Sequence, residues 1–256
     1  MSVKIVKELV EMSEIARLKT GIPGLDEVLE SGLPRNYAYS VVGAPGSGKT
    51  IMGAQFLYRG ATQYGDNGIY ASLEEPTHSI ANNMLRFNFN LFDLESQGKL
   101  VLLDASPHQD QPNSELKIRG GSVGTEKFDL DGLLGAVAHA RKNVAAKRCV
   151  IDSLMSIATA YTQQAGFRFR LLHFLRALSE LELTTLILTE SPTPIVREFG
   201  VDSMLTNGTF LLQTSNETDG VHQMIEIPKM RGVKVQRKTL PYKVTQNGIE
   251  VKPEEQ

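Results

Sequence analysis

A glycine-rich segment of eight residues constrains this chain more than any other feature of its sequence. Residues 43–50 read Gly-Ala-Pro-Gly-Ser-Gly-Lys-Thr and match the pattern G-x-x-x-x-G-K-[ST] in full. The segment follows an apolar run at residues 37–42 and opens a helix-like pattern at residues 50–62. Glycines let successive backbone N–H groups curve around phosphate oxygens, and the helix that follows adds the positive end of its dipole. The order strand, loop and helix therefore predicts a phosphate-binding turn.

Two side chains of this turn predict a nucleotide with a metal ion. The charge of Lys49 can reach the β- and γ-phosphates, and the hydroxyl of Thr50 can ligate Mg²⁺. A dinucleotide-binding fold is disfavoured, because no G-x-G-x-x-G segment follows a predicted strand. The residues expected to contact the nucleotide are Gly43, Ala44, Pro45, Gly46, Ser47, Gly48, Lys49, Thr50 and Ile51.

Around this turn the chain alternates short apolar runs with amphipathic stretches. The apolar runs predict strands at residues 37–42, 68–73, 99–103, 148–151 and 184–188. The amphipathic stretches predict helices at residues 50–62, 76–87, 129–146 and 167–183. Solid apolar strands that alternate with helices form a mostly parallel sheet covered on both faces. The predicted fold class is therefore α/β.

The two ends and one internal segment differ from this alternation. Residues 1–18 have near-helical spacing of valines, which is compatible with a short leading helix, and residues 105–127 contain prolines and glycines that predict a long polar loop. After about residue 200, alternating apolar and polar residues predict strands of antiparallel type. These strands are expected at residues 209–213, 222–228, 240–245 and 249–252. We divide the chain into an N-terminal extension, residues 1–19, and a single domain, residues 20–253.

Composition excludes several classes of protein. The 256 residues include 27 Lys and Arg against 29 Asp and Glu, so the net charge of −2 rules out a basic field over the whole surface for coating DNA. The single cysteine, Cys149, excludes a disulfide framework within the chain and strongly disfavours a zinc site built on cysteines. We find neither an 18-residue apolar run nor a secretory signal, so we expect a cytoplasmic protein without a membrane partner.

A carboxylate follows the strand predicted at residues 148–151. Asp152 stands where that strand ends, and the carboxyl edge of a parallel sheet is where ligands bind. There the Asp152 carboxylate can hold a water of the Mg²⁺ shell, so we add it to the nucleotide-binding and metal-binding residues together with Thr50. The alternative is that Asp152 or Ser153 caps the segment that follows.

Carboxylates also follow two other predicted strands. Glu74 and Glu75 can orient a water and accept its proton, or they can compensate the dipole of a helix that begins at Pro76. These two interpretations are evenly balanced by spacing alone. Glu190 ends the fifth strand, where it either senses the γ-phosphate or lies exposed in the loop before Pro192.

Basic residues gather in one stretch near the C-terminus. They are Lys229, Arg231, Lys234, Arg237, Lys238 and Lys243. Strand alternation would place Lys229 and Arg231 on one face, two residues apart. Three roles fit them: a solvated strand face, a contact to nucleic acid, or cations directed at a phosphate. For an arbitrary sequence the solvated face is the commonest of the three.

Taken together, these motifs resemble the KaiC-like branch of the RecA-type P-loop ATPases. Besides the phosphate-binding turn, the matching segments lie at residues 20–27, 32–34, 55–58, 73–75, 98–105, 151–153, 199–201, 229–232, 240–242 and 248–249. The resemblance covers nearly the whole chain. It is closest to the single-domain KaiC-like proteins common in archaea, whereas the clock protein has two such domains in tandem.

The resemblance implies more than the spacing does. It implies a RecA-like core, ATP and Mg²⁺ as ligands, and rings, usually hexamers, with ATP at the subunit interfaces. Glu74 and Glu75 would be the catalytic pair beside Lys49, and Lys229 and Arg231 would reach the ATP of a neighbouring subunit. The resemblance does not extend to autokinase activity or a clock role, because residues 198–206 lack the adjacent Ser-Thr pair that is phosphorylated in the clock protein.

The leading interpretation is an oligomeric Mg²⁺-dependent ATPase, slow in turnover, whose ring serves as a regulatory or assembly platform. One alternative is a RadA-paralog-like recombination accessory that binds single-stranded DNA. Its candidate contacts are Arg168, Arg170, Lys234, Arg237 and Lys238. The net charge and the few aromatic residues available for base stacking disfavour it. A second alternative is a nucleotide-gated scaffold without catalysis.

Overall fold

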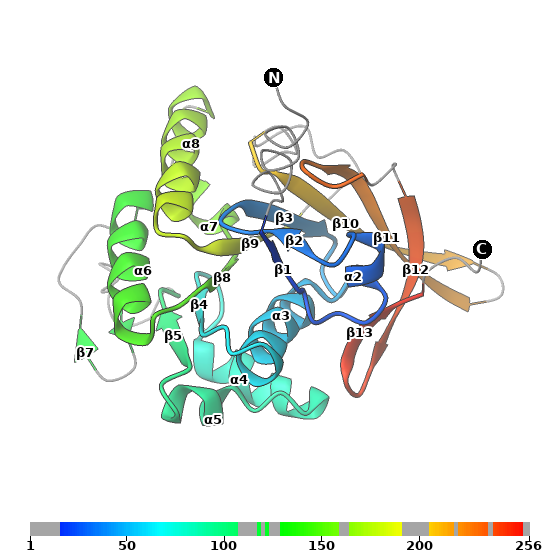
Figure 1. Cartoon of the computed structure of the whole chain (residues 1–256), viewed down its shortest axis with the longest axis horizontal. Helices are drawn as coiled ribbons and strands as arrows, with labels where there is room; N and C mark the ends of the chain where they lie inside the picture. The colour runs from blue at the N-terminus through cyan, green and yellow to red at the C-terminus, as the bar shows by residue number, and fades with distance from the viewer. Residues whose placement is uncertain are drawn as a thin grey trace, which may run out of the picture.

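The computed structural model describes residues 16–106, 117–118, 121–122, 129–158, 164–190, 205–217, 220–234 and 238–252. These residues form the predicted α/β fold around an 11-stranded sheet with the order β13-β12-β11-β10-β3-β9-β8-β4-β5-β6-β7. Figure 1 shows the sheet between two groups of helices, with the C-terminal strands at one end. No helix in these parts of the chain is long and apolar enough to cross a lipid bilayer.

The centre of the sheet is parallel. Its strands are β3 (Ala38–Gly43), β9 (Thr184–Glu190), β8 (Arg148–Asp152), β4 (Gly68–Ser72) and β5 (Leu100–Asp104). Each is paired in parallel with its neighbour in that order. The carboxyl ends of the five strands therefore lie along one edge of the sheet, and this edge carries the acidic residues that the sequence places after the strands.

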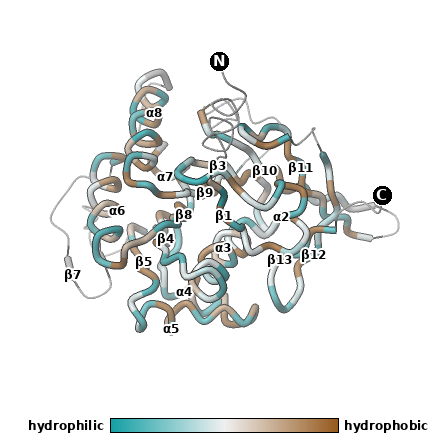
Figure 2. The backbone as a smooth tube through the Cα atoms, viewed as in Figure 1, coloured by the Kyte–Doolittle hydropathy of each residue, from teal (hydrophilic) through white to brown (hydrophobic). Residues whose placement is uncertain are grey.

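Helices cover both faces of the sheet. On one face lie α3 (Lys49–Gln63), α4 (Thr77–Met84), the 3-10 turn η1 (Leu85–Phe87) and α5 (Leu91–Ser96), and on the other α6 (Leu130–Val144) and α8 (Gln164–Glu180). Alternate strand residues supply two separate cores: Tyr70 and Val150 belong to the first, and Ile69 and Ile151 to the second. Figure 2 shows the corresponding alternation of hydrophilic and hydrophobic positions along α6 and α8.

The C-terminal strands extend the sheet beyond β3. They are β10 (Gly208–Glu217), β11 (Gly220–Met230), β12 (Lys238–Thr245) and β13 (Gly248–Val251). The antiparallel pairing predicted here is confirmed from β10 to β13, and β10 also pairs in parallel with β3. The side chain of Gln55 in α3 accepts from Ile249 N at 2.7 Å and donates to Ile249 O at 3.0 Å. This two-way bond fastens the outermost strand to the helix that follows the phosphate-binding turn.

Two segments differ from the prediction. Residues 17–18, placed at the end of the leading helix, form strand β1 (Arg17–Leu18), which pairs with β2 (Leu33–Pro34) in a separate two-stranded sheet beside α2 (Leu25–Val28). The 2% exposure of Leu18 explains this: pairing with β2 buries its side chain in the first core. The loop predicted at 105–127 contains strands β6 (Lys117–Ile118) and β7 (Gly121–Ser122), which extend the sheet beyond β5. Apart from residues 16, 105 and 106, the rest of these two segments lies outside the described residues.

Two short helices, α5 and α7 (Met155–Ala158), have no counterpart in the prediction. The short helix α5 follows Asn90, whose side-chain oxygen accepts a hydrogen bond from Asp93 N at 3.2 Å. Asparagine is a favoured residue at the N-cap of a helix, because its side chain accepts a hydrogen bond from one of the free N–H groups of the first turn. Leu91 and Leu94 are buried in the first core. Its six residues are too few to show a helical period.

Candidate functional site

The phosphate-binding turn connects β3 to α3, as predicted. Gly43 ends the strand, Lys49 begins the helix, and Gly46 and Gly48 have positive φ angles of 79° and 90°. A side chain at Gly43 would collide with Ser47 Oγ and would meet the Leu212 carbonyl at 2.7 Å, so only glycine fits between the turn and the neighbouring strand β10. From below, the Tyr242 hydroxyl donates to the Ser47 carbonyl at 2.7 Å. The turn is thus held in place by the C-terminal strands.

A cleft of about 330 Å³ opens above this turn. Its walls come from the turn, from the start of α3 and from the carboxyl ends of β4, β8 and β9. The lining residues are Pro45, Gly46, Gly48, Lys49, Thr50, Ile51, Ser72, Glu74, Glu75, Asp152 and Glu190. Every acidic residue that the sequence placed at a strand end for nucleotide chemistry therefore lies in one cleft with the phosphate-binding turn.

Lys49 lies folded back over its own turn. Its Nζ donates to the Gly43 carbonyl at 2.9 Å and to the Ala44 carbonyl at 3.0 Å, and its side chain is 7% exposed. Its Nζ is 3.8 Å from Oε1 of Glu190, which is the last residue of β9. The ammonium is therefore surrounded by oxygen atoms at the base of the cleft, the environment that phosphate oxygens would also supply.

Asp152 is linked to the start of α3 and to β4. Its Oδ2 accepts hydrogen bonds from Thr50 Oγ1 at 3.0 Å and from the Tyr70 hydroxyl at 2.7 Å. Burial raises the pKa of the Asp152 carboxyl, and these two hydrogen bonds only partly offset that effect. The carboxylate is consequently a partly buried negative charge at the wall of the cleft, which a cation would stabilise.

The donor atoms at Thr50 and Asp152 fit a hard divalent cation. A hydroxyl and a carboxylate oxygen are ligands that suit Mg²⁺, which usually takes one or two protein ligands and completes its shell with waters and phosphates. Among the described residues no cluster of three or more His, Cys, Asp and Glu could hold a metal alone. The residues present therefore fit Mg²⁺ bound together with a phosphate ligand, and they do not fit a cage made only of protein atoms.

The two glutamates of the cleft have different surroundings. Glu74 Oε1 accepts from Ser153 Oγ at 2.6 Å and from Ser156 Oγ, in α7 (Met155–Ala158), at 3.0 Å. The Glu75 carboxylate forms no hydrogen bond or ion pair with the described residues, although Ser72 Oγ donates to its backbone carbonyl. The helix after them begins at Thr77 rather than Pro76. One carboxylate is therefore oriented by the next strand end, and the other is free within the cleft.

Lys229 and Arg231 lie far from the cleft of their own chain. Lys229 pairs with Thr209, which pairs with Ser40 near the start of β3, whereas the phosphate-binding turn follows the end of β3. Lys229 Nζ donates to the Thr206 carbonyl at 2.9 Å. Arg231 follows the last residue of β11 and is exposed, so strand alternation does not place the two side chains on one face. Neither residue lines the cleft of its own chain.

Sequence reasoning missed three contributors to this site. They are Tyr70 beneath Asp152, Ser156 beside Glu74, and Tyr242 beneath the turn. Tyr70 lies within an apolar run that reads as an ordinary buried strand. Its contact with Asp152 joins residues 82 positions apart, so no local pattern in the sequence could have revealed it.

Comparison with known proteins gives consistent results. The family model described as "ATPase: KaiC" matches residues 18–256. The circadian clock oscillator protein KaiC of Prochlorococcus marinus (strain MIT 9313) is 30% identical over 94% of this chain, and KaiC of Synechococcus elongatus is 31% identical over 95% of it. These matches cover 46% and 45% of the two relatives, so the chain spans about half their length. The crystal structure of a KaiC-like protein from Pyrococcus horikoshii OT3 superposes with a TM-score of 0.78 at 30% identity, covering 93% of this chain and 100% of that one.

Proposed function

Because the chain belongs to the KaiC family of ATPases, we propose that it is a Mg²⁺-dependent ATPase that turns over slowly within a homo-oligomeric ring, with a hexamer as the expected form. One observation carries the proposal: the phosphate-binding turn, the Thr50–Asp152 pair and two glutamates line the same cleft. Binding, metal coordination and water activation each have a residue there. We further propose a regulatory or assembly role for the ring in the cytoplasm.

The chain binds ATP through the turn and the start of α3. Backbone N–H groups of residues 44–50 surround the phosphates, and Lys49 exchanges its carbonyl partners for β- and γ-phosphate oxygens. Thr50 and Asp152 would hold Mg²⁺, which when bound neutralises phosphate charge and orients the triphosphate. Glu190, next to Lys49, is placed to respond to the presence of the γ-phosphate.

The glutamate pair supplies the base. Glu74 is fixed by two serine hydroxyls, and Glu75 is free to meet a water above the phosphates. One carboxylate orients the water while the other accepts its proton as the water oxygen attacks the γ-phosphorus. The bond from that phosphorus to the β-γ bridging oxygen breaks, giving ADP and phosphate.

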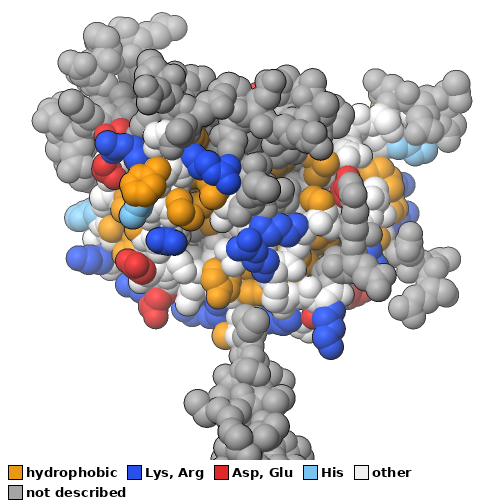
Figure 3. Space-filling model, turned by 90° about the horizontal axis from the view of Figure 1, so that it is seen from above, with side chains coloured by type: hydrophobic (Ala, Val, Ile, Leu, Met, Phe, Trp, Pro, Cys, Tyr) orange, Lys and Arg blue, Asp and Glu red, His pale blue; other side chains and the backbone are white. Residues whose placement is uncertain are grey.

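The position of Lys229 and Arg231 supports their action in trans. Since both lie toward the edge of the sheet where β3 begins, whereas the turn follows the end of β3, two subunits in a head-to-tail ring would bring these cations toward the neighbour's ATP. Arg231 suits this role because its planar guanidinium can bond two phosphate oxygens at once. Nucleic acid is the weaker partner: on the face shown in Figure 3, basic side chains form separate groups interspersed with acidic and apolar ones.

The decisive experiment replaces the base and keeps the cleft. The double variant Glu74→Gln/Glu75→Gln retains the shape of both side chains, so ATP should still bind in an equilibrium assay while hydrolysis falls about 10²–10⁴-fold. Lys49→Ala should instead abolish binding. If the double variant hydrolyses ATP as fast as the parent, the two glutamates only compensate the dipole of the helix that follows, and the proposed ATPase mechanism is wrong.

Ring formation has its own test. Light scattering with and without ATP measures assembly, and co-expression of Arg231→Ala with Lys49→Ala subunits tests the trans contact. A mixed ring contains interfaces with one intact half-site from each variant, so two inactive proteins should regain part of the activity. No recovery in rings shown to be mixed would mean that Arg231 acts elsewhere. A single-stranded DNA affinity that falls steeply with salt would favour the recombination alternative.

A further inference from the structure

The hydroxyl of Tyr70 contacts the carboxylate of Asp152, the residue proposed above to hold Mg²⁺ together with Thr50. Tyr70 lies in β4 with 0% exposure, and its hydroxyl donates to Asp152 Oδ2 at 2.7 Å. The same oxygen accepts from Thr50 Oγ1 at 3.0 Å. Both hydrogen bonds of the Asp152 side chain within the described residues therefore fall on Oδ2, and Oδ1 receives none. A carboxylate held in this way has one oxygen fastened to the protein and one left for a ligand.

We propose that Tyr70 is a positioning residue for Mg²⁺: its hydroxyl fixes the Asp152 carboxylate so that the other carboxylate oxygen serves the metal's water shell. This inference rests on the proposed Mg²⁺-dependent function. Thr50 alone would be a weaker anchor, because its hydroxyl must also offer a lone pair to the metal. Tyr70 has no such second task. Partners of this kind, which orient a metal ligand without touching the metal, typically contribute 10- to 100-fold in metal affinity.

A second buried tyrosine shows what Tyr70 would do as a purely structural residue. Tyr39 in β3 also has 0% exposure, and its hydroxyl donates to the Pro34 carbonyl at 2.7 Å. The two side chains share size, burial, core and hydrogen-bond length, and only the acceptor differs. Tyr39 satisfies a backbone carbonyl, whereas Tyr70 reaches a carboxylate in the cleft. Tyr39 is therefore a matched control for the loss of one buried hydroxyl.

The test compares Tyr70→Phe with Tyr39→Phe. Calorimetry measures ATP affinity in EDTA and across a Mg²⁺ series, which separates binding of the nucleotide from the gain that the metal adds. In EDTA, Tyr70→Phe should bind ATP as the parent does. The Mg²⁺ concentration that gives half of the gain should rise about tenfold. Tyr39→Phe should leave both quantities unchanged, even if it lowers stability.

A double-mutant cycle verifies that Tyr70 acts through the carboxylate. In an Asp152→Asn background, Tyr70→Phe should add little to the loss, because coupled residues are non-additive. An equal Mg²⁺ response in Tyr70→Phe and Tyr39→Phe, or full additivity in the cycle, would overturn the inference and leave the proposed function standing. If Mg²⁺ does not change the ATP affinity of the parent protein, both the inference about Tyr70 and the proposed Mg²⁺-dependent function are overturned. Phenylalanine fills the same space at position 70, and thermal unfolding confirms that each variant is folded.

Discussion

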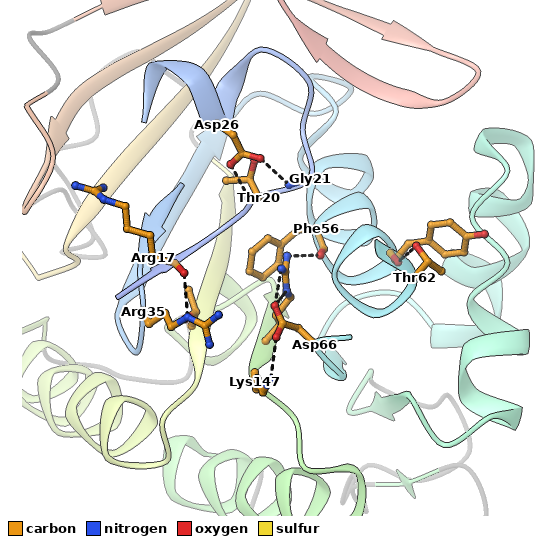
Figure 4. A network of polar contacts seen from close by, with 12 residues as sticks. Arg17, Thr20, Gly21, Asp26, Arg35, Phe56, Thr62, Asp66 and Lys147 are labelled. Carbon is orange, nitrogen blue, oxygen red and sulfur yellow. Dashed lines mark hydrogen bonds and ion pairs between the residues drawn. The ribbon is translucent and has the colours of Figure 1, made fainter. Parts of the chain in front are cut away.

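Strand β8 carries a charged residue at each end: Arg148 at its start is buried, whereas Asp152 at its end is partly buried and lines the cleft. Arg148 at its start has 0% exposure and pairs with Asp66 at 2.8 Å, while its Nη1 donates to the Phe56 carbonyl at 3.0 Å. Figure 4 shows this end of the molecule, with Phe56, Asp66 and Lys147 labelled. Asp152 at the other end of the strand meets neutral hydroxyl groups as its only hydrogen-bond donors among the described side chains.

The two carboxylates show the consequence in opposite pKa directions. Burial acts to raise the pKa of Asp66, but hydrogen bonds and charge from Arg148 and Lys147 outweigh it and hold the pKa below its usual value. At Asp152 burial prevails and the pKa is raised. A buried charge that the chain neutralises itself belongs to the architecture. A buried charge that it leaves uncompensated marks the place where a ligand completes the structure.

The largest effect is expected at the uncompensated end. Asp152→Asn should lower Mg²⁺-dependent hydrolysis by about 10²-fold or more, because the amide carries no charge for the metal. Removing a charge that burial disfavours and its surroundings offset only in part should cost no stability, so the urea midpoint should stay level or rise. Asp104→Asn is the control: Asp104 ends β5, two strands away from β8, and accepts from Ser106 Oγ at 2.6 Å, but does not line the cleft. If Asp152→Asn and Asp104→Asn lose hydrolysis to a similar extent, Asp152 has no special role as the carboxylate that faces the cleft.

The compensated end should show the reverse pattern. Arg148→Met leaves Asp66 buried without its main partner, and breaking a buried pair on one side destabilises proteins by about 3–5 kcal/mol. Urea unfolding measures this loss, and ATP affinity of the protein that remains folded should change little. Adding Asp66→Leu should restore part of the stability, since an apolar pair removes the stranded charge. Loss of ATP affinity without loss of stability would reverse the assignment of the two ends.

The pH dependence of stability should also identify the compensated end. The folded-state pKa of Asp66 is depressed, so its contribution is complete above the unfolded value near 3.8 and is lost as pH falls through the lower folded value. The stability gap between the parent and Asp66→Asn should therefore narrow on acidification from pH 7. Asp131→Asn, at an exposed pair with Arg170, should show a small gap at every pH. If the stability difference between the parent and Asp66→Asn instead grows as the pH falls, the pKa of Asp66 is not lowered on folding.

The smallest effect concerns the orientation of Glu74. Ser156→Ala removes one of its two serine donors and leaves Ser153 in place. A single hydrogen bond of this kind is worth about 1 kcal/mol, so we expect kcat to fall about fivefold with KM unchanged. Ser96→Ala, which removes a hydroxyl bonded to the Asp93 carbonyl in α5, should leave kcat unaffected. An unchanged kcat in Ser156→Ala would show that the second serine is dispensable.

Local motifs made most of the fold predictable, and contacts distant in sequence made the rest unpredictable. The turn at residues 43–50 and the five central strands are encoded by neighbouring residues, so the sequence located them within a few positions. Strands β1 and β6 are two residues long and have no period to detect. Their formation depends on a partner strand elsewhere in the chain.

The same division applies to the site. Lys49, Thr50 and Asp152 follow from the turn motif and from the end of an apolar strand. The roles of Tyr70 and Arg148 do not, because each depends on a contact 82 positions away in the chain. For Arg231 a local pattern is misleading. Strand alternation predicts that its side chain shares a face with Lys229, but β11 ends one residue earlier, at Met230, and the chain turns at Arg231.

The bond between Tyr242 and Ser47 has a consequence for how the protein is made. These residues are 195 positions apart, so the ribosome completes the phosphate-binding turn long before it supplies the strand beneath it. β12 then docks on the turn through Tyr242, and β13 docks on α3 through Gln55. A nascent chain stalled before residue 242 would display the whole glycine-rich motif without its support. We therefore expect competence to hold nucleotide to arise only once residue 242 has been made, so that ATP would bind chains that contain this strand in preference to shorter fragments.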